Sequence, residues 1–579
     1  MSSNSLQVQF DPSAARFGAS RSQKRLEDDR LLVGKGRFSD DRVLPGQQWM
    51  VLVRSPHAHA RITSIDLSAC RSAPGVVAAW SMADLRADGV KHIPYPQLFK
   101  RADGSPMAAP ARTPLAEGKV LYAGHPVAAI VAGTREQAQD AAELAAIEYE
   151  DLPSVVDPRD AVRPGAPVVF EGAPENVAAQ ATYGDAAAAA RAFADAVHVV
   201  EVELHNQRLN AMALEPRTFL AVVEDGRLTL YTQNQTPTAA RDLLPMVLGG
   251  KAQDYRVVNG DIGGGFGMKT GLTPEDALVC YAARKLGRPV KWRADRSEEF
   301  LAAHMGRDMH FKGALALDAD GKFLALRMEM LGNIGAVPVG SSAMIPLMMV
   351  AKVTTSVYRV PVVDYRIRAV LTNTMATGAY RGAGRPEGNY LVERLVELAA
   401  RKTGIDGAEL RRRNFLKPAD MPYRTHVGET YDTGDFGRML DRVLAAADWA
   451  GFPARAAESR RRGKLRGRGL SSYLEWTGAL PTETVDFEVG ADGTVTVFSG
   501  TQAMGQGLET AYTQLVVELL DVAPENVRIV QGDTDRANGV GSVGSRSAFV
   551  GGSALVAAGR KAIVRGKELA ADALEAAPS

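Results

Sequence analysis

Short apolar runs separated by polar residues recur through the first part of the chain. They predict strands at Trp49 to Val53, Val76 to Trp80 and Ala128 to Val131. A helix is expected to follow the last of these strands, from about Thr134 to Glu148. An alanine-rich helix is predicted from Ala186 to Ala196. Strands interleaved with helices are typical of a mixed α/β (α+β) fold.

A glycine-rich loop separates a predicted buried strand, Tyr255 to Asn259, from a predicted helix. The helix begins after Thr273, which suits an N-cap, and ends at Gly287. The loop itself has the sequence Gly-Gly-Gly-Phe-Gly-Met-Lys over 263–269. Glycines at such a place let backbone N–H groups approach a bulky anion closely, although a tight structural turn would explain them equally well.

Two familiar phosphate-binding loops do not fit this segment. A P-loop has glycine directly before Lys-Ser/Thr, whereas Met268 precedes Lys269 and Thr270. A dinucleotide fingerprint that began at Gly263 would need a third glycine, or an alanine, at Met268. A nucleotide-binding module is therefore the least favoured function for this loop.

The chain also contains an internal repeat. The strand-like segment from Asp225 to Gln235 has the same spacing as Asp492 to Gln502, and both copies end on glutamine. Each copy continues into a helical stretch and then into a strand that ends in Gly-Asp, at 260–261 and at 532–533. Each Gly-Asp opens a glycine-rich loop, which in the second copy lies at 539–547 and also contains serines. The repeat predicts two similar α/β units whose loops face a shared cleft. The matching glutamines favour a shared ligand over a purely architectural duplication.

Composition narrows the classes of protein that the chain can represent. Its 579 residues predict about two to four domains, and its net charge of +1 offers no electrostatic case for nucleic acid or an acidic membrane surface. Cys70 and Cys280 lie far apart, which argues against a disulfide framework, a zinc site or an iron–sulfur cluster in this chain. The N-terminus does not resemble a secretory signal and no apolar run reaches membrane-spanning length. A cytoplasmic protein without membrane insertion is expected.

Prolines and glycines between 153 and 167 mark the end of the first α/β region. The expected division of the chain is an N-terminal arm at 1–25, an α/β domain at 26–162, a linker at 163–190, a first unit of the repeat at 191–430 and a second unit at 431–579.

Residues that could carry chemistry are few. Arg381 and Arg385 lie in a glycine-rich turn before a helix expected from about Gly388 to Thr403, and arginine there suits a planar or anionic ligand because it donates several hydrogen bonds without titrating. His57 and His59 could lie on one face of a strand, but without an evident third ligand a structural role is favoured over metal binding. The chain has no Gly-x-Ser-x-Gly elbow and no His-Glu-x-x-His motif. Hydrogen-bond donors without a protein nucleophile are expected where a cofactor carries the chemistry.

Four motifs occur in order: Gly-Gly-Gly-Phe-Gly at 263–267, Tyr-Arg-Gly-Ala-Gly-Arg at 380–385, Met-Gly-Gln-Gly at 504–507 and Gly-Ser-Arg-Ser at 544–547. Together with Arg-Ser-Pro-His-Ala-His-Ala-Arg at 54–61, they closely resemble the molybdopterin-binding large subunit of the xanthine dehydrogenase, aldehyde oxidase and carbon monoxide dehydrogenase family. The resemblance extends from about Arg25 to the last residue. It implies an α/β hammerhead-like domain at 26–162 and two related molybdopterin-binding units, the second incomplete.

The resemblance further implies a molybdenum hydroxylase, an oxidoreductase that adds water-derived oxygen to an electron-poor carbon of a small molecule such as an N-heterocycle or an aldehyde. The metal would be held by a pterin dithiolene, commonly in the cytosine dinucleotide form, with no direct protein ligand. Electrons would pass to [2Fe-2S] clusters and FAD on partner subunits.

The resemblance also assigns roles by position. Gln235 resembles the glutamine that hydrogen-bonds the apical oxo ligand, with Gln233 as the less favoured register, and Arg381 resembles the arginine that orients substrate and stabilises developing negative charge. Gln506 resembles the glutamine beside the dithiolene. The catalytic candidates are Arg381 and Gln235. The cofactor-binding candidates are Gln235, Gly265, Phe266, Gly267, Arg381, Arg411, Gly505, Gln506, Gly507, Thr510, Ser545, Arg546 and Ser547.

Three departures from the family pattern limit these expectations. Thr270 stands where purine-oxidising members have a glutamate, and Gly382 stands where carbon monoxide dehydrogenases have a copper-binding cysteine. The family's general base is a glutamate in a Gly-x-Gly-Glu motif, which does not occur in this sequence. The chain is therefore expected to be the N-terminal portion of a large subunit, with a separate polypeptide supplying the missing C-terminal part and the base. The alternative is a truncated, catalytically silent fragment that binds cofactor or partners without turnover.

Overall fold

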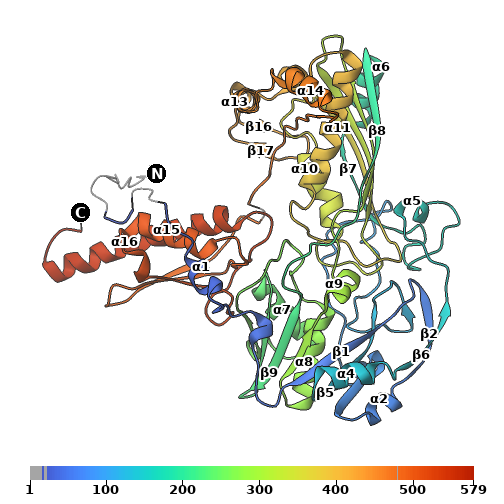
Figure 1. Cartoon of the computed structure of the whole chain (residues 1–579), viewed down its shortest axis with the longest axis vertical. Coiled ribbons are helices and arrows are strands. Elements are labelled where there is room, and N and C mark those ends of the chain that lie inside the picture. The colour runs from blue at the N-terminus through green and yellow to red at the C-terminus, as the bar shows by residue number, and fades with distance from the viewer. Residues whose placement is uncertain (1–15, 19–21, 479, 579) are drawn as a thin grey trace.

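The computed structural model describes residues 16–18, 22–478 and 480–578. Figure 1 shows three bodies: a lower one, an upper one built on long strands, and a third at the side that includes the C-terminal helix. The expected arm at 1–25 lies mostly outside the described residues. Among the described residues, no helix combines the length and the apolar character needed to cross a bilayer.

The lower body is built on a seven-stranded sheet with the order β11-β10-β9-β12-β1-β5-β3. Its strands are β1 (Gln48–Arg54), β3 (Val76–Ser81), β5 (Pro126–Ala132), β9 (Thr218–Glu224), β10 (Arg227–Thr232), β11 (Tyr255–Asn259) and β12 (Val290–Arg293). The strands predicted at 49–53, 76–80, 128–131 and 255–259 are all confirmed. β1 pairs in parallel with β12, so main-chain hydrogen bonds join the expected hammerhead-like domain to the first repeat unit.

Helices cover this sheet and a small neighbouring one. They are α2 (Ser68–Ser72), α3 (Met82–Ala87), α4 (Arg135–Ala142), α7 (Pro237–Leu248), α8 (Pro274–Leu286) and α9 (Arg296–Ala302). α8 has the predicted caps: Thr273 accepts a hydrogen bond from the Asp276 N–H, and Gly287 takes the left-handed conformation at φ 62°. The neighbouring sheet has the order β4-β2-β6, with β2 (Ala60–Asp66), β4 (Lys119–Val120) and β6 (Ala146–Asp151).

The helix predicted from Thr134 to Glu148 is wrong in its second half. α4 ends at Ala142, and the chain turns back as β6. The sequence of β6 alternates apolar and acidic residues, so Ile147 and Tyr149 face a buried cluster while their neighbours face solvent. Pairing of Ile147 with Ile65 of β2 satisfies the backbone there, and this tertiary pairing overrides the helical tendency of the segment.

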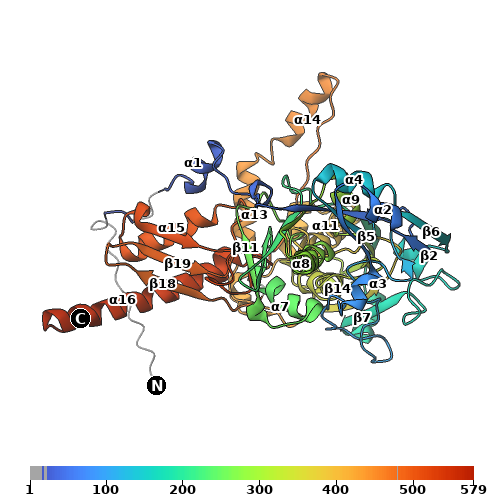
Figure 2. The same ribbon diagram turned by 90° about the horizontal axis from the view of Figure 1, so that it is seen from below.

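The upper body is built on a five-stranded sheet with the order β7-β15-β14-β13-β8. Its strands are β7 (Val177–Gly184), β8 (His198–Asn206), β13 (Met309–Leu317), β14 (Phe323–Asn333) and β15 (Val362–Val370). Its helices are α5 (Pro158–Ala161), α6 (Ala186–Ala194), α10 (Val350–Val353), α11 (Arg385–Thr403), α12 (Gly407–Asn414), α13 (Phe436–Ala446) and α14 (Phe452–Arg461), with a small ladder of β16 (Tyr423–Arg424) and β17 (Thr430–Tyr431). Figure 2 shows α14 projecting from the rest of the molecule. The predicted helices at 186–196 and 388–403 are confirmed as α6 and α11.

α11 packs on one face of this sheet, where Leu391 and Leu395 lie against Gly313. α6 lies on the other face, where Arg327 of β14 covers the ring of Phe193. Between α6 and α5 that second face carries polar side chains and borders a cavity of about 890 Å³. We call it the outer face of the five-stranded sheet.

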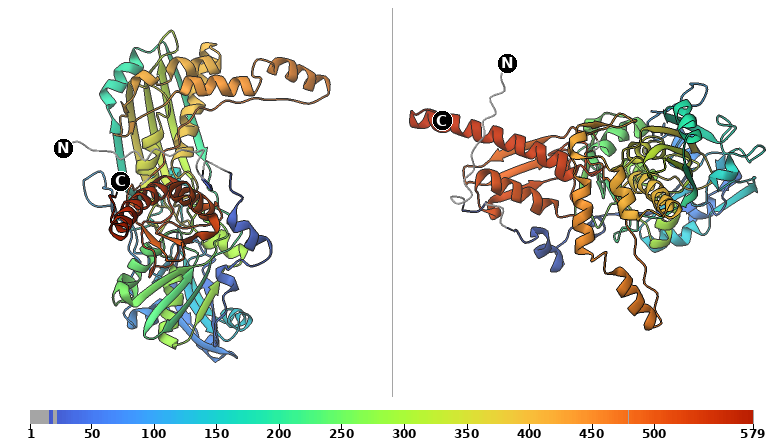
Figure 3. Two further views of the ribbon diagram at one scale, coloured as in Figure 1. Left: turned by 90° about the vertical axis from the view of Figure 1, so that its left-hand side faces the viewer. Right: turned by 90° about the horizontal axis from the view of Figure 1, so that it is seen from above.

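The third body repeats the topology of β9 to α8. It contains β18 (Val485–Val489), β19 (Val495–Ser499), α15 (Leu508–Leu520), β20 (Val527–Val530) and α16 (Gly552–Leu574). Leu228 of β10 lies between Val223 and Tyr255, and the matching Val495 of β19 lies between Val489 and Val527. In both units the first two strands pair antiparallel and the second and third strands pair in parallel, which confirms the predicted repeat. Figure 3 shows α16 lying along this body.

His57 and His59 do not lie on one face of a strand. They occupy the turn between β1 and β2, next to Pro56, which cannot donate to a sheet ladder. Nδ1 of His57 is 2.6 Å from Oδ1 of Asp151, and Nδ1 of His59 is 2.7 Å from the Pro153 carbonyl oxygen. The two rings therefore tie this turn to the segment that follows β6.

Candidate functional site

The glycine-rich loops of the two repeat units lie side by side. The Asn259 N–H donates to the Gly532 carbonyl over 2.7 Å, and the Thr534 N–H donates to the Val257 carbonyl over 3.1 Å. These bonds place the end of β11, where the first loop begins, against the segment that follows β20, where the second loop begins. The two loops therefore start beside each other, as expected for loops that face a shared cleft.

Gln235 joins these loops. Its Oε1 accepts a hydrogen bond from the Gly267 N–H over 2.8 Å, and its Nε2 donates to the Ser542 carbonyl over 2.8 Å. A Cβ at Gly265 would lie 2.5 Å from Oε1 of Gln235 and 2.7 Å from Sδ of Met504, so only glycine fits there. Gln233 is separate from this cluster, because its Oε1 accepts from the Thr218 N–H at the start of β9.

Phe266 and Arg381 are adjacent through their backbones. The Arg381 N–H donates to the Phe266 carbonyl over 2.8 Å, and the Arg381 carbonyl accepts from Nη2 of Arg307 over 2.6 Å. Arg307 is itself held by Glu387 at 3.0 Å. Phe266 has a φ of 55° and is 39% exposed, an unusual conformation for a bulky residue. The backbone here is fixed from both sides.

The side chain of Arg381 takes no part in these backbone contacts. It is exposed, and it makes no hydrogen bond or ion pair with any part of the chain that the structure describes. A guanidinium on an immobilised backbone is well placed to donate to an external anion or carbonyl oxygen.

A buried ion pair supports the first loop. Nζ of Lys269 lies 3.1 Å from Oε2 of Glu215, and the same oxygen accepts from the Gly263 N–H over 2.7 Å. Burial lowers the pKa of Lys269 and raises that of Glu215, and each partner opposes the effect on the other. Lys269 is therefore committed to the loop itself. Sequence reasoning missed Glu215, because no local pattern links it to a loop about 50 residues later.

The start of α8, directly after this loop, is held by further buried charges. Glu275 contacts Nη2 of Arg54 at 2.9 Å and Nη1 of Arg217 at 3.2 Å. Arg217 also reaches Glu299 at 2.7 Å, and Arg54 reaches Glu298 at 2.7 Å. This five-residue network joins β1, β9, α8 and α9 beneath the loop, and the sequence contained no signal for it.

The Met-Gly-Gln-Gly loop of the second unit is held by its own side chain. Oε1 of Gln506 accepts from the Met504 N–H over 2.6 Å, and its Nε2 donates to the Gln502 carbonyl over 3.0 Å. Gly505 and Gly507 have φ values of 95° and 77°, and no atom lies within 4 Å of the place where a Cβ would stand. The glycine side of this loop thus faces open space and allows close approach of a ligand.

Thr510, in the first turn of α15, is engaged by α1 (Leu26–Leu32). Its hydroxyl donates to Oε2 of Glu27 and accepts from the Leu26 N–H over 2.8 Å. Oε1 of Glu27 also accepts from the Glu509 N–H over 3.1 Å. Burial works against ionisation of Glu27, but these hydrogen bonds outweigh it and place its pKa below the ordinary value. A residue from the other end of the chain therefore caps the helix that follows the Met-Gly-Gln-Gly loop.

Replacement of Glu27 by alanine is expected to lower the free energy of unfolding by about 1–2 kcal/mol, because α15 loses its N-terminal cap. We also expect a lower cofactor content in the purified protein, since Thr510 loses its partner and the helix that follows the Gln506 loop loses its cap. Urea unfolding and metal analysis would measure the two effects. Asp29→Ala, an exposed acidic residue on the same helix, is the matched control. Equal stability and equal cofactor content of the two variants would contradict a role of Glu27 in capping α15.

The Gly-Ser-Arg-Ser motif contributes unequally. Ser545 has a φ of 56°, and its hydroxyl donates to Oε1 of Glu475 over 2.9 Å. Arg546 is fully buried and forms an ion pair with Glu483. The Ser547 hydroxyl donates to that of Ser542 over 2.7 Å. The two serines border the loops, whereas the Arg546 guanidinium lies inside the protein.

Arg411 lies apart from the loops. It is 1% exposed, and its guanidinium donates to Glu393 of α11 and to the carbonyls of Gly407 and Leu470. The structure therefore places Arg411 in a buried ion pair that joins α12 to α11. The other candidates meet around the loop junction: Gln235, Gly265, Phe266, Gly267, Arg381, Gly505, Gln506, Gly507, Thr510, Ser545 and Ser547.

The composition of this junction suits a metal that arrives with its own organic ligand. The loops at 263–269, 380–385, 502–507 and 539–547 contain neither cysteine nor histidine. They offer instead glycine backbone facing open space, an unpaired guanidinium at Arg381 and the amide of Gln506. Such donors bind oxygen-rich, anionic groups such as a phosphorylated pterin.

Comparison with known proteins agrees with this site. Residues 33–153 match the a/b hammerhead domain of aldehyde oxidase and xanthine dehydrogenase, and residues 169–415 and 442–579 each match a molybdopterin cofactor-binding domain. The chain is 35% identical over 565 residues to the 6-hydroxypseudooxynicotine dehydrogenase complex subunit gamma of Paenarthrobacter nicotinovorans, covering 96% of this chain and 70% of that one. It is 34% identical to the carbon monoxide dehydrogenase large chain of Hydrogenophaga pseudoflava, over 95% of this chain and 71% of that one.

A solved structure has the same fold. Quinoline 2-oxidoreductase from Pseudomonas putida 86 superposes with a TM-score of 0.90 at 34% identity, over 96% of this chain and 72% of that one. Fold and domain order thus coincide with one family. This chain belongs to the molybdopterin-binding large subunits of the xanthine dehydrogenase, aldehyde oxidase and carbon monoxide dehydrogenase family, the molybdenum hydroxylases.

Proposed function

We propose that this chain is the cofactor-binding subunit of a molybdenum hydroxylase that adds water-derived oxygen to an electron-poor carbon of an N-heterocycle or an aldehyde. The observation that carries the proposal is the junction of four motif loops beside the free guanidinium of Arg381. When bound, the molybdenum–pterin group, which we propose to be the cytosine dinucleotide form, supplies the oxygen-transfer and two-electron chemistry.

The residues of the chain would position the cofactor and the substrate. Phe266 and the glycines at 265 and 267 would pack beside the cofactor, and Gln235 would hold their loop in place. Gln506 and Thr510 would contact the pterin side, next to the capped start of α15. Arg381 would donate to the substrate and stabilise the negative charge that develops on it.

Two positions narrow the substrate class. Gly382 has a φ of 95°, and a Cβ there would lie 2.4 Å from Cγ of Pro386. A cysteine side chain at this position would clash, which disfavours a copper-dependent oxidation of carbon monoxide. The hydroxyl of Thr270 donates to the Gly267 carbonyl over 3.1 Å and cannot replace a substrate-binding carboxylate. Heterocycles such as quinoline, named for one relative above, fit this pattern better than purines.

Electron transfer would require other chains. Cys70 and Cys280 are buried, far apart in sequence and in different elements, so they cannot ligate a shared cluster. We propose that an iron–sulfur subunit with [2Fe-2S] clusters and an FAD subunit assemble with this chain. The named relative is itself the gamma subunit of a complex.

The internal repeat points to a further partner segment. In the first unit β9 pairs with β10 on one side and antiparallel with β12 on the other, where Ala221 lies opposite Val290. The equivalent strand in the second unit, β18, has β19 on one side and no strand on the other among the described residues. By the shared register, Phe487 corresponds to Ala221. We infer that a partner segment adds an antiparallel strand to this edge of β18.

Hydrogen–deuterium exchange in the native complex tests this strand addition. The Gly490 N–H donates to the Thr494 carbonyl, so alternation directs the N–H groups of Val485 and Phe487 away from β19. In the isolated chain these amides are expected to exchange within seconds, and in the assembled complex to be protected at least about tenfold. Peptides from β8, another edge strand, provide the reference. Unchanged exchange at 485–489 in the complex would rule out pairing at this edge.

Purification of the chain from its native host tests the function as a whole. We expect about one molybdenum per chain, with iron carried by a co-purifying subunit and with a partner that contains Gly-x-Gly-Glu. Elemental analysis and mass spectrometry of every co-purifying polypeptide measure these properties. A chain free of molybdenum and of partners would instead support the silent-fragment alternative.

A further inference from the structure

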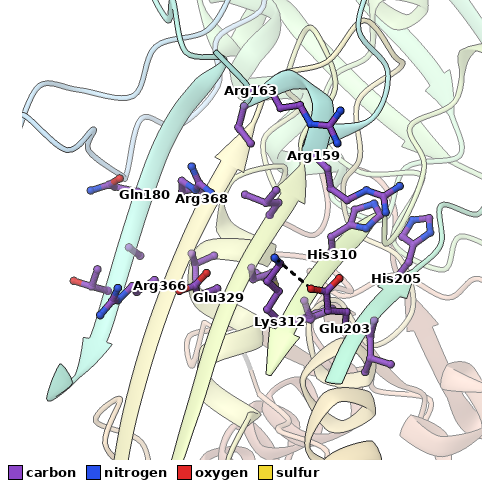
Figure 4. A pocket seen from close by; sticks show the side chains of 18 residues that line it. Arg159, Arg163, Gln180, Glu203, His205, His310, Lys312, Glu329, Arg366 and Arg368 are labelled. Carbon is purple, nitrogen blue, oxygen red and sulfur yellow. Dashed lines mark ion pairs between the residues drawn. The ribbon is translucent and has the colours of Figure 1, made fainter. Parts of the chain in front are cut away.

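Three potential metal ligands meet on the outer face of the five-stranded sheet, away from the loop junction. Asp308, with φ 65°, directly precedes β13, and His310 is the second residue of that strand. His205 of β8 lies directly opposite His310 in the antiparallel pairing. Figure 4 shows His205 and His310 side by side at one end of the cavity, with Arg159 next to them.

This arrangement is that of a compact strand-built metal site. Two ligands on neighbouring strands, together with a third from the residue before one of those strands, can face a single ion from one side. The ligand atoms of His205, Asp308 and His310 lie within 4.8 Å of one another. Ligands around a tetrahedral zinc ion at about 2.0–2.1 Å stand ~3.4 Å apart, so a modest closure would bring all three into range.

The carboxylate of Asp308 is oriented for such a role. Its Oδ2 accepts hydrogen bonds from Nε of Arg208 and from Nδ2 of Asn333, both over 2.9 Å. Its Oδ1 lies 3.4 Å from Nε2 of His205, in the direction of the two imidazoles. Outer donors that fix one oxygen and leave the other free are typical of metal-binding carboxylates.

His310 supplies the second, independent observation. Its side chain is nearly buried, with 9% of its surface exposed, yet neither ring nitrogen has a hydrogen-bond partner among the described residues. Because His310 lines the cavity, its ring nitrogens are open to an ion or to water from that side. The His205 and His310 rings stack at 4.0 Å with an interplanar angle of 8°. Since nitrogen lone pairs lie in the ring plane, the rings must turn out of this stack to share one ion.

We propose that His205, Asp308 and His310 bind one divalent transition-metal ion, with Zn²⁺ the best match, in a site separate from the molybdenum cofactor. Two imidazoles and one carboxylate leave at least one coordination position for water or an external ligand. That position faces the cavity of about 890 Å³. Five cationic side chains (Arg159, Arg163, Lys312, Arg366 and Arg368) and two carboxylates (Glu203 and Glu329) line this cavity. The lining is therefore positive on balance, and the external ligand that it favours is anionic, such as a carboxylate or phosphate.

Cobalt substitution in the purified native protein tests the site. Co²⁺ titration is expected to produce visible absorption bands that saturate at one ion per chain and disappear on addition of Zn²⁺. His205→Ala and His310→Ala should each weaken binding by more than about 100-fold, because loss of a ligand exceeds the effect of losing an outer hydrogen bond. Asn333→Ala, which removes one hydrogen bond to Asp308, should weaken it by about tenfold.

The controls separate this site from other metal binding. His57→Ala removes a histidine that also contacts an aspartate, and it should leave the Co²⁺ spectrum and affinity unchanged. Molybdenum content should be the same in all these proteins. His205 is half exposed, so its replacement is expected to preserve folding. Equal affinity in wild type, His205→Ala and His310→Ala would show an adventitious ion only, and would overturn the proposal.

Discussion

Replacement of Arg381 by alanine is expected to lower kcat of the assembled enzyme by about 10²–10³-fold while leaving its molybdenum content unchanged. The physical reason is that the protein holds the backbone of Arg381 but not its side chain. Phe266 and Arg307 fix the backbone of Arg381, but the guanidinium makes no hydrogen bond or ion pair with the described part of the chain. In the proposed role, its loss would therefore remove a donor to the substrate without removing a support of the fold.

Steady-state kinetics and metal analysis on the same preparation distinguish the possible roles of Arg381. Arg381→Lys should recover only part of the activity, because an ammonium cannot donate two parallel hydrogen bonds to one planar group. Arg401→Ala, an exposed arginine on α11, is the matched control and should retain full activity. Loss of molybdenum from Arg381→Ala would show instead that the arginine holds the cofactor.

The features that sequence could predict are those with a local cause. The caps of α8 follow from Thr273 and Gly287, whose preferences act within one turn of helix. The repeat was visible because equal spacing of apolar residues and Gly-Asp pairs produces equal strand registers, which the structure confirms. The meeting of Gln235 with the loop at 265–267 follows from that repeat.

The features that sequence could not predict depend on burial of charge. Arg411 is one of three consecutive arginines, and only its position around the axis of α12 directs its side chain inward to Glu393. Arg546 similarly enters the interior, where Glu483 neutralises it. A side chain expected to reach a phosphate and one that closes a buried ion pair look identical in a sequence. Glu215 and Glu27 were missed for the same reason, because their partners are distant along the chain.

The site is therefore assembled from distant pieces that the two repeat units bring together. Each unit contributes a strand, a glycine loop and a helix start, and residues outside the units hold those helix starts in place. Glu27 of α1 caps α15, whereas Arg54 of β1 contacts Glu275 at the start of α8. The N-terminal part of the chain thus supports both units.

Glu275→Ala is expected to lower the free energy of unfolding by about 3–5 kcal/mol, the range observed when one partner of a buried ion pair is removed. Glu275 is 2% exposed, and its loss would leave the guanidinium groups of Arg54 and Arg217 buried without their shared carboxylate. Urea unfolding followed by tryptophan fluorescence suits the measurement, because Arg217 lies 5.4 Å from the ring centre of Trp292. Glu568→Ala on the exposed face of α16 should change stability by less than about 0.5 kcal/mol.

The Glu275 carboxylate also makes the stability of the protein depend on pH. Burial alone would raise the pKa of Glu275, but Arg217 and Arg54 outweigh it and lower the pKa from 4.5 to about 2. A depressed pKa means that the ionised group stabilises the fold fully above pH 4.5, and that this stabilisation disappears as pH falls from 4.5 through 2. Wild type should therefore lose more stability than Glu275→Gln over that interval. Parallel pH profiles of the two proteins would show that Glu275 does not carry the interaction, and that the loop above α8 is supported by other contacts.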